Sequence, residues 1–241
     1  MKKLFGLFAG ILPCLLLSGQ AQSDFVPLKE LFGNDFLTGV AVNGRSITGD
    51  AGKMVIDNFN TITCENEMKP QSLLYFPNQP RMGMPPAQGG QPGQAPQRQG
   101  AQPGQAPRIQ GGPPSQGMGG FTPAPLKLDT IDGLVFNWAQ ADLIADFARA
   151  NNLKMRGHTL VWHSQTPAAF FTDDKGNQLT KEQLYARLKV YMTAVMNRYK
   201  DVIFCWDVVN EATSDNEGEI YRTTSPWYRI CGKDFLATAF R

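Results

Sequence analysis

Short apolar runs recur along the chain on both sides of a long polar stretch, and four of them are candidate β-strands. They occupy residues 37–42, 61–64, 154–161 and 202–209. Their apolar residues are mostly consecutive, with no regular alternation, which is typical of strands in a parallel sheet that is covered on its outer face. The pattern predicts four strands of one parallel sheet.

Two segments between these runs carry apolar residues at helical spacing. The residues are Phe136, Leu143, Phe147 and Ala150 in the first segment, and Leu184, Leu188, Tyr191 and Val195 in the second. The second helix has a start signal, because Thr180 followed by Gln183 fits a capping box. The first helix can end at Asn151 and Asn152, since Asn tolerates a left-handed backbone.

The alternation of strands and helices predicts an α/β fold. Such a succession either closes into a (β/α)8 barrel or opens into a doubly wound sheet, and the pattern alone does not choose between them. No glycine-rich phosphate loop follows any of the four strands. Its absence argues against a nucleotide-binding sheet.

The first 21 residues have the pattern of a secretory signal. Lys2 and Lys3 precede an apolar run over residues 4–17, and small residues lead to Ala21. The run is shorter than the roughly 20 apolar residues that a membrane-spanning helix requires. We therefore expect residues 1–21 to be cleaved and the mature protein to be secreted or periplasmic, without a membrane anchor.

Residues 77–125 form a low-complexity segment that is rich in Gln, Gly and Pro and contains an imperfect tandem repeat. Such a stretch has few apolar side chains to offset the entropy of ordering it, so we expect a disordered surface insert. A linker to another module and a flexible tether on the substrate are alternatives. A tolerated insertion is favoured, because extending a long loop costs little.

Composition excludes several classes of partner. The chain has 241 residues, enough for one domain, and a formal net charge of +2, which indicates neither a nucleic acid nor an anionic surface. Cys64, Cys205 and Cys231 are an odd number and argue against a disulfide framework; the first two are expected to be buried in strands. No Cys/His spacing indicates a metal site, and no cofactor is expected.

Polar groups cluster where three of the predicted strands end, in segments 65–70, 156–167 and 206–211. The last segment closes with Asn210 and Glu211. A carboxylic acid beside an amide suits glycosidic bond cleavage, because the acid protonates the departing oxygen while the amide binds a sugar hydroxyl. A helix-capping Asn beside a surface Glu is the alternative for the dipeptide alone. Three such strand ends predict a carbohydrate cleft on one rim of a parallel barrel.

These segments resemble a known family. RGHTLVWHSQTP (156–167), ENEMKP (65–70) and WDVVNEA (206–212) are similar to the third, second and fourth strand motifs of family 10 glycoside hydrolases, the endo-β-1,4-xylanases. The likeness extends to residues 28–42 and 221–235. It implies a (β/α)8 barrel, of which residues 22–76 and 126–241 would supply about the first four βα units.

The resemblance also implies roles for eight residues. Glu211 would be the general acid and then the general base, and Asn210 would bind the 2-hydroxyl of the sugar beside the cleaved bond. The remaining substrate-binding residues would be Glu65, Asn66, Lys69, His158, Trp162 and Gln165. Equal strand parity places His158 and Trp162 toward the cleft, with Trp162 offering a flat apolar face to a pyranose.

Other residues of these motifs are expected to support the site. His163 has the opposite strand parity to Trp162, which predicts a buried imidazole bonded to a carboxylate, with Asp207 as the candidate. Trp138, Trp206 and Trp227 are expected to be packing residues, with Trp206 between the barrel and the helices.

The family's nucleophile, a second glutamate at the end of a seventh strand, has no matching motif in this sequence. We therefore expect a truncated enzyme whose 241 residues alone are inactive and marginally stable, and which is a monomer when full length. Xylan or xylo-oligosaccharides are the expected substrates. A β-glucanase-like retaining β-glycosidase and an inactive carbohydrate-binding half-barrel are the alternatives.

Overall fold

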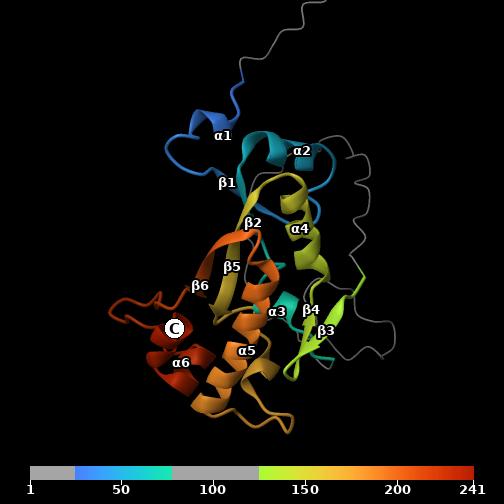
Figure 1. The fold of residues 1–241 in the computed structure, drawn as a ribbon. Helices are drawn as coiled ribbons and strands as arrows, with labels where there is room; N and C mark the ends of the chain where they lie inside the picture. The colour runs from blue at the N-terminus through green and yellow to red at the C-terminus, as the bar shows by residue number, and fades with distance from the viewer. Residues whose placement is uncertain (1–24, 78–124) are drawn as a thin grey trace, which may run out of the picture.

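A parallel sheet of four strands, in the order β1-β2-β5-β6, organises the molecule in the computed structural model (Figure 1). The strands are β1 (Gly39–Val42), β2 (Thr61–Cys64), β5 (Lys154–Trp162) and β6 (Ile203–Asn210). All four predicted strands are present, and small differences occur at their ends. Their common direction places every carboxyl end at one edge of the sheet, which is where the polar segments begin.

The structure describes residues 25–77 and 125–241. The predicted signal over residues 1–21 and residues 78–124 of the predicted insert lie outside the described residues. Within the described ranges, no helix combines the length and the apolar character that crossing a membrane would require.

Helices connect successive strands and cover the sheet. They are α1 (Leu28–Leu31), α2 (Gly49–Asn58), α3 (Pro70–Leu73), α4 (Ala139–Ala150), the 3-10 helix η1 (Ala168–Phe171), α5 (Lys181–Tyr199), α6 (Pro226–Cys231) and α7 (Asp234–Ala239). In Figure 1 the C-terminal end of α5 lies next to α4, and the contacts of Arg198 and Tyr199 with Asp142 join the two helices there. The predicted start of α5 is confirmed, because Thr180 and Gln183 exchange both hydrogen bonds of a capping box.

The prediction of a helix from Phe136 onward is wrong at its start. Phe136 lies in β4 (Leu134–Asn137), which pairs antiparallel with β3 (Leu128–Ile131), and α4 begins only at Ala139. The dipeptide Asp132-Gly133 joins the two strands, and both residues have positive φ, at 45° and 81°. Asp-Gly between two apolar runs is a strong signal for a two-residue hairpin, and it was present in the sequence.

Aromatic packing joins this hairpin to α5. The rings of Phe136 and Trp138 stack with centroids 4.5 Å apart, and Phe136 also stacks on Tyr191. Tyr199 meets Trp138 edge to face at 6.1 Å. All four side chains are fully buried, so they form the part of the core that fixes α5 against the polypeptide before α4.

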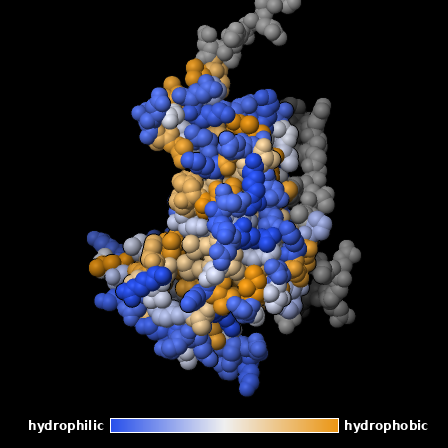
Figure 2. Space-filling model, in the orientation of Figure 1, coloured by the Kyte–Doolittle hydropathy of each residue, from blue (hydrophilic) through white to orange (hydrophobic). Residues whose placement is uncertain are grey.

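Strands β1 and β6 are the outer strands of the sheet within the described residues. Cys64 on β2 is buried as predicted, and its burial raises the pKa of the thiol well above its usual value. Cys205 on β6 was also expected to be buried, and that prediction is wrong: it is exposed. Cys205 is exposed because β6 is an outer strand of the sheet. In the space-filling view, the molecular surface is indented beside β5 and β6 (Figure 2).

A glycine allows β5 and β6 to pack closely. Gly157 pairs with Trp206 across the two strands. A Cβ built on Gly157 would lie 2.1 Å from Cε3 of the Trp206 ring, closer than any two such atoms can approach. The half-buried indole therefore lies directly on the backbone of β5, as predicted for a packing residue.

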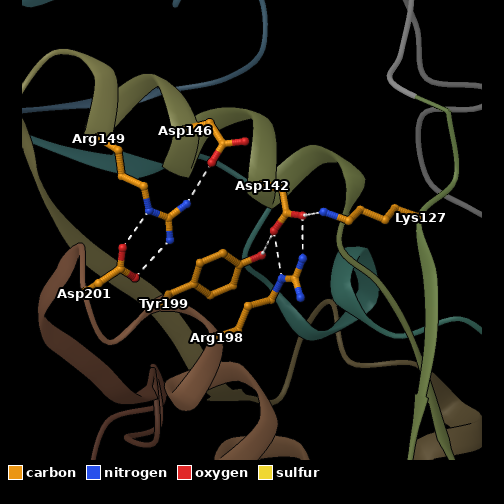
Figure 3. A network of polar contacts seen from close by, with 7 residues as sticks. All are labelled: Lys127, Asp142, Asp146, Arg149, Arg198, Tyr199 and Asp201. Atoms are coloured by element: carbon orange, nitrogen blue, oxygen red, sulfur yellow. Dashed lines mark hydrogen bonds and ion pairs between the residues drawn. The ribbon is translucent and has the colours of Figure 1, made fainter.

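A polar network ties α4 to α5 (Figure 3). The Asp142 carboxylate on α4 accepts hydrogen bonds from Nε and Nη2 of Arg198, at 2.8 and 2.6 Å, from the Tyr199 hydroxyl, and from Lys127. Burial raises the pKa of Asp142, but the bonds from Arg198 and Lys127 outweigh it and hold the pKa below the ordinary 3.8. The folded state thus keeps this carboxylate charged.

Replacing Asp142 with Asn tests that network. We expect the free energy of unfolding at neutral pH to fall by about 2 kcal/mol, because Arg198 and Tyr199 lose their shared charged acceptor. Asp146→Asn on the same helix is the matched control: its side chain is 72% exposed, so the loss should stay within about 0.5 kcal/mol. Denaturant unfolding of the two variants checks this, and equal losses would contradict it.

Candidate active site

The polar residues at the strand ends surround a cavity of about 810 Å³ on the sheet. Its lining includes five of the predicted site residues, Glu65, Asn66, Lys69, His158 and Asn210, together with Arg156 and Asp207. These residues come from β5, from β6 and from the loop after β2, so the parallel sheet brings together segments that are far apart in the sequence. The cavity offers many hydrogen-bonding groups, as a polyol ligand requires.

Glu211 lies directly after β6, beside Trp162 at the end of β5. Its Oε2 accepts a hydrogen bond of 2.8 Å from Nε1 of Trp162, and Nε2 of His163 lies 3.9 Å from the same oxygen. The side chain is 52% exposed, so the carboxyl group is accessible to a ligand. Both neighbours approach Oε2, which leaves Oε1 as the oxygen that can exchange a proton with a ligand.

Trp162 takes part in the site through its polar edge, which sequence reasoning did not predict. It was expected to offer an apolar face to a sugar; in the structure its indole N–H holds Glu211, and the Lys69 ammonium lies 4.7 Å from its ring centroid. Its backbone carbonyl accepts hydrogen bonds from Thr166 Oγ1 and Trp227 Nε1, at 2.7 and 3.0 Å. The position of Glu211 therefore depends on a residue that is itself held at three points.

Lys69, the one lysine among the predicted binding residues, is buried. Its Nζ donates to Asn66 Oδ1 at 3.0 Å and lies over the Trp162 ring. Glu65 accepts from Asn43 Nδ2 at 2.8 Å. Asn43 was missed, although it directly follows the first predicted strand and obeys the same strand-end rule as the residues that were found.

The predicted pairing of His163 with Asp207 is wrong. Asp207 binds His158 instead, with 2.9 Å between Nδ1 and Oδ2, and its Oδ1 accepts from Arg156 Nε and Nη2. The strand parity behind that prediction assumed a regular strand. In β5, however, the register with β6 shifts between His158 and Val161, so parity before the shift does not carry across it.

His163 lies beside Glu211 and is half-buried; its Nδ1 is buried, and no residue within 25–77 or 125–241 forms a hydrogen bond with it. Burial lowers the pKa of His163, the Arg222 guanidinium lowers it further, and Glu211 and Asp215 only partly oppose them. The imidazole is therefore neutral at neutral pH. Nε2 is the ring nitrogen that faces the Glu211 carboxyl group.

Gln165 is placed apart from the cavity lining, on the loop after β5. Its backbone is left-handed, with φ of 46°, and its carbonyl oxygen accepts a hydrogen bond of 2.8 Å from the Gln71 backbone N–H. This bond fixes the loop against α3. Across residues 25–77 and 125–241, no group of three or more His, Cys, Asp and Glu side chains is arranged to hold a metal ion.

A hydrogen-bonded carboxyl group lies beside a cavity lined by hydrogen-bonding side chains, an arrangement that is typical of carbohydrate sites on α/β scaffolds. The family model of glycosyl hydrolase family 10 matches residues 27–241. The chain belongs to this family. The described residues accordingly form four strands of a (β/α)8 barrel.

Individual relatives agree with that placement. Endo-1,4-beta-xylanase A of Caldicellulosiruptor sp. (strain Rt8B.4) is 35% identical over 231 residues, a match that covers 92% of this chain and 25% of the relative. The solved endo-1,4-beta-xylanase from Caldicellulosiruptor owensensis is 30% identical with a TM-score of 0.61, covering 89% of this chain and 48% of that one. A solved mutant in complex with xylotriose is 28% identical with a TM-score of 0.62, covering 90% and 48%. The chain thus spans about half of the solved relatives.

The titration of His163 checks the electrostatics of the site. We expect its pKa to lie below the ordinary 6.5, so that the folded state binds fewer protons than the unfolded state as the pH falls through 6.5. This contribution to stability is present above the ordinary value and is lost as the pH drops toward the folded pKa. NMR titration of the imidazole signals measures it, and His163→Gln assigns the signal. A pKa above 6.5 would contradict the burial and the Arg222 effect.

Proposed function

We propose that the full-length protein is a secreted endo-β-1,4-xylanase that cleaves internal bonds of xylan with retention of configuration. In this proposal, residues 27–241 supply the N-terminal half of the barrel and the acid/base residue, Glu211. The observation that carries the proposal is the 2.8 Å hydrogen bond from Trp162 to Glu211 beside a cavity lined by hydrogen-bonding side chains. The xylanase relatives, together with the similar solved structure in complex with xylotriose, support the choice of substrate.

The chemistry follows from the two oxygens of Glu211. Oε2 accepts from Trp162, so the acid carries its proton on Oε1 and delivers it to the glycosidic oxygen as the bond to the sugar breaks. In the second step the same oxygen takes a proton from the attacking water. Asn210, directly before it and paired with Trp162 across the strands, binds the 2-hydroxyl as charge develops on the ring.

In this proposal the cavity binds the glycone, the part of the substrate on the side of the sugar whose bond is cleaved. Glu65, Asn66 and Lys69 present an anionic acceptor, an amide and an ammonium from one loop, which suits the vicinal hydroxyls of a pyranose. His158 completes this lining, with its ring orientation fixed by Asp207. Trp162 contributes through its hold on Glu211 as well as through any contact with the sugar.

Retention requires a second carboxylate about 5–5.5 Å from Glu211, across the scissile bond. The family resemblance places it on a seventh strand, for which this sequence has no motif. We therefore propose that the 241 residues are part of a longer protein, which acts as a monomer, and that alone they hydrolyse xylan negligibly. The alternative is a non-catalytic half-barrel, which would result if the protein had no nucleophile at all.

Substitution of Glu211 by Gln in the full-length protein tests the assignment. We expect the kcat for xylan to fall by at least about 10²-fold, because the amide cannot donate the proton. Glu217→Gln, an exposed change in the loop that follows, should leave the rate unchanged. Release of reducing ends from xylan measures the effect, and undiminished hydrolysis by Glu211→Gln would refute the role.

The choice of polymer is tested separately. The full-length protein is supplied with xylan and with β-1,4-glucan, and the products and their first-formed anomers are followed by NMR. We expect xylo-oligosaccharides of β configuration. Release of gluco-oligosaccharides without xylo-oligosaccharides would favour a β-glucanase, and α-configured first products would exclude retention.

A further inference from the structure

The backbone of Glu211 has an unusual conformation. Its φ is 51°, in the left-handed region that favours glycine and is unfavourable for other residues. The conformation turns the chain sharply at the end of β6, and it directs the carboxyl group to Trp162. Such a conformation persists only where neighbouring groups hold it.

Arg222 is the side chain that contacts this backbone. Its Nε donates a hydrogen bond of 3.2 Å to the Glu211 carbonyl oxygen, and its own backbone N–H donates to the Ala212 carbonyl at 2.9 Å. Its Nη2 pairs with Asp215 at 2.7 Å. The Arg222 side chain is only 18% exposed, whereas Asp215 is 86% exposed. The Arg222 side chain is therefore mostly enclosed, although its ion-pair partner Asp215 is open to solvent.

The loop between Glu211 and Arg222 folds back on itself. Thr213 and Tyr221 form an antiparallel bridge, and the Tyr221 ring packs on Tyr228 of α6 with 5.9 Å between centroids. The Ser225 backbone N–H, at the start of α6, donates to the Arg222 carbonyl at 3.1 Å. Arg222 is thus anchored to α6, and through its side chain it connects that helix to the residue that ends β6.

Resting on the proposed function, we propose that Arg222 is a positioning residue: it holds the Glu211 peptide in its left-handed conformation, so that the protonated carboxyl meets the glycosidic oxygen. Arg222 acts through the backbone of Glu211, while Trp162 acts through the side chain. The hydrogen bonds from Arg222 to the backbone carbonyl and from Trp162 to the carboxylate together fix the orientation of Glu211, while its carboxyl group stays accessible.

The charge of Arg222 has a second effect on the same group. Its guanidinium lowers the pKa of His163, which keeps that imidazole neutral beside Glu211. A protonated His163, 3.9 Å from Oε2, would compete with the ligand for the carboxylate. The electrostatic effect and the backbone contact therefore favour the same arrangement of the acid.

The test uses Arg222→Met in the full-length protein with two substrates. A xylo-oligosaccharide needs a proton on its leaving group, whereas an aryl β-xyloside with a strongly electron-withdrawing phenol does not. We expect kcat/KM for the oligosaccharide to fall at least about tenfold, since misplacement of a catalytic group by about 1 Å can cost up to 10²-fold. The activated xyloside should change by less than about twofold. A merely structural role would lower both equally.

Arg229→Met is the matched control, because Arg229 is an exposed arginine seven residues further along. It should leave both substrates and the pKa of His163 unchanged, whereas Arg222→Met should raise that pKa toward the ordinary value. If Arg222→Met does not accumulate as folded protein, Arg222→Lys carries the comparison of the two substrates, since it keeps the charge but not the planar fork.

Glu211→Gln separates this proposal from the proposed function. If Glu211→Gln is impaired on the oligosaccharide and a folded Arg222→Met enzyme is not, or if Arg222→Met is impaired equally on both substrates, the role of Arg222 is refuted while the function stands. If Glu211→Gln retains full activity, the proposed function fails first. Selective loss in both variants supports both.

Discussion

The site depends on the parallel pairing of β5 with β6. This pairing sets Trp162 opposite Asn210, so the next residue along β6, Glu211, comes within reach of the indole N–H. The pairing is close because Gly157 leaves room for the Trp206 ring on the backbone of β5. A side chain at Gly157 would push the strands apart near their middle, and the displacement would reach the acid at their carboxyl ends. An exposed functional group is thus positioned by a contact within the sheet.

Support for the acid extends from the core outward in identifiable steps. Trp227 is fully buried among the phenylalanines of η1, and its indole N–H donates to the Trp162 carbonyl. Trp162 then donates to Glu211, and Arg222 donates to the Glu211 carbonyl from the other side. Each step is a single directional hydrogen bond from a donor with little freedom to move. A half-exposed carboxyl group can be held in one direction in this way while remaining open to a substrate.

The sequence predicted the sheet and the strand-end rule because both depend on local composition and on the shared direction of parallel strands. By that rule Glu65, Asn66, Lys69, His158 and Asn210 were expected together, and they line one cavity. The partners within the site were less predictable. Asp207 binds His158, and His163 lies beside Glu211. The register of β5 with β6 shifts between His158 and Val161, and no local sequence pattern signals such a shift. The role of Arg222 depends on how a loop returns to its own beginning, which only the folded chain shows.

The charges around the cavity explain why a neutral ligand suits it. Arg156 is neutralised by Asp207, and the buried ammonium of Lys69 is engaged by Asn66 and the Trp162 ring. Glu65 is held by Asn43. A strongly charged ligand would have to break one of these pairings, whereas a sugar hydroxyl can donate to a carboxylate and accept from an ammonium without displacing either. The site therefore selects by the direction and number of its hydrogen bonds, and a formal net charge of only +2 adds little steering from the rest of the chain.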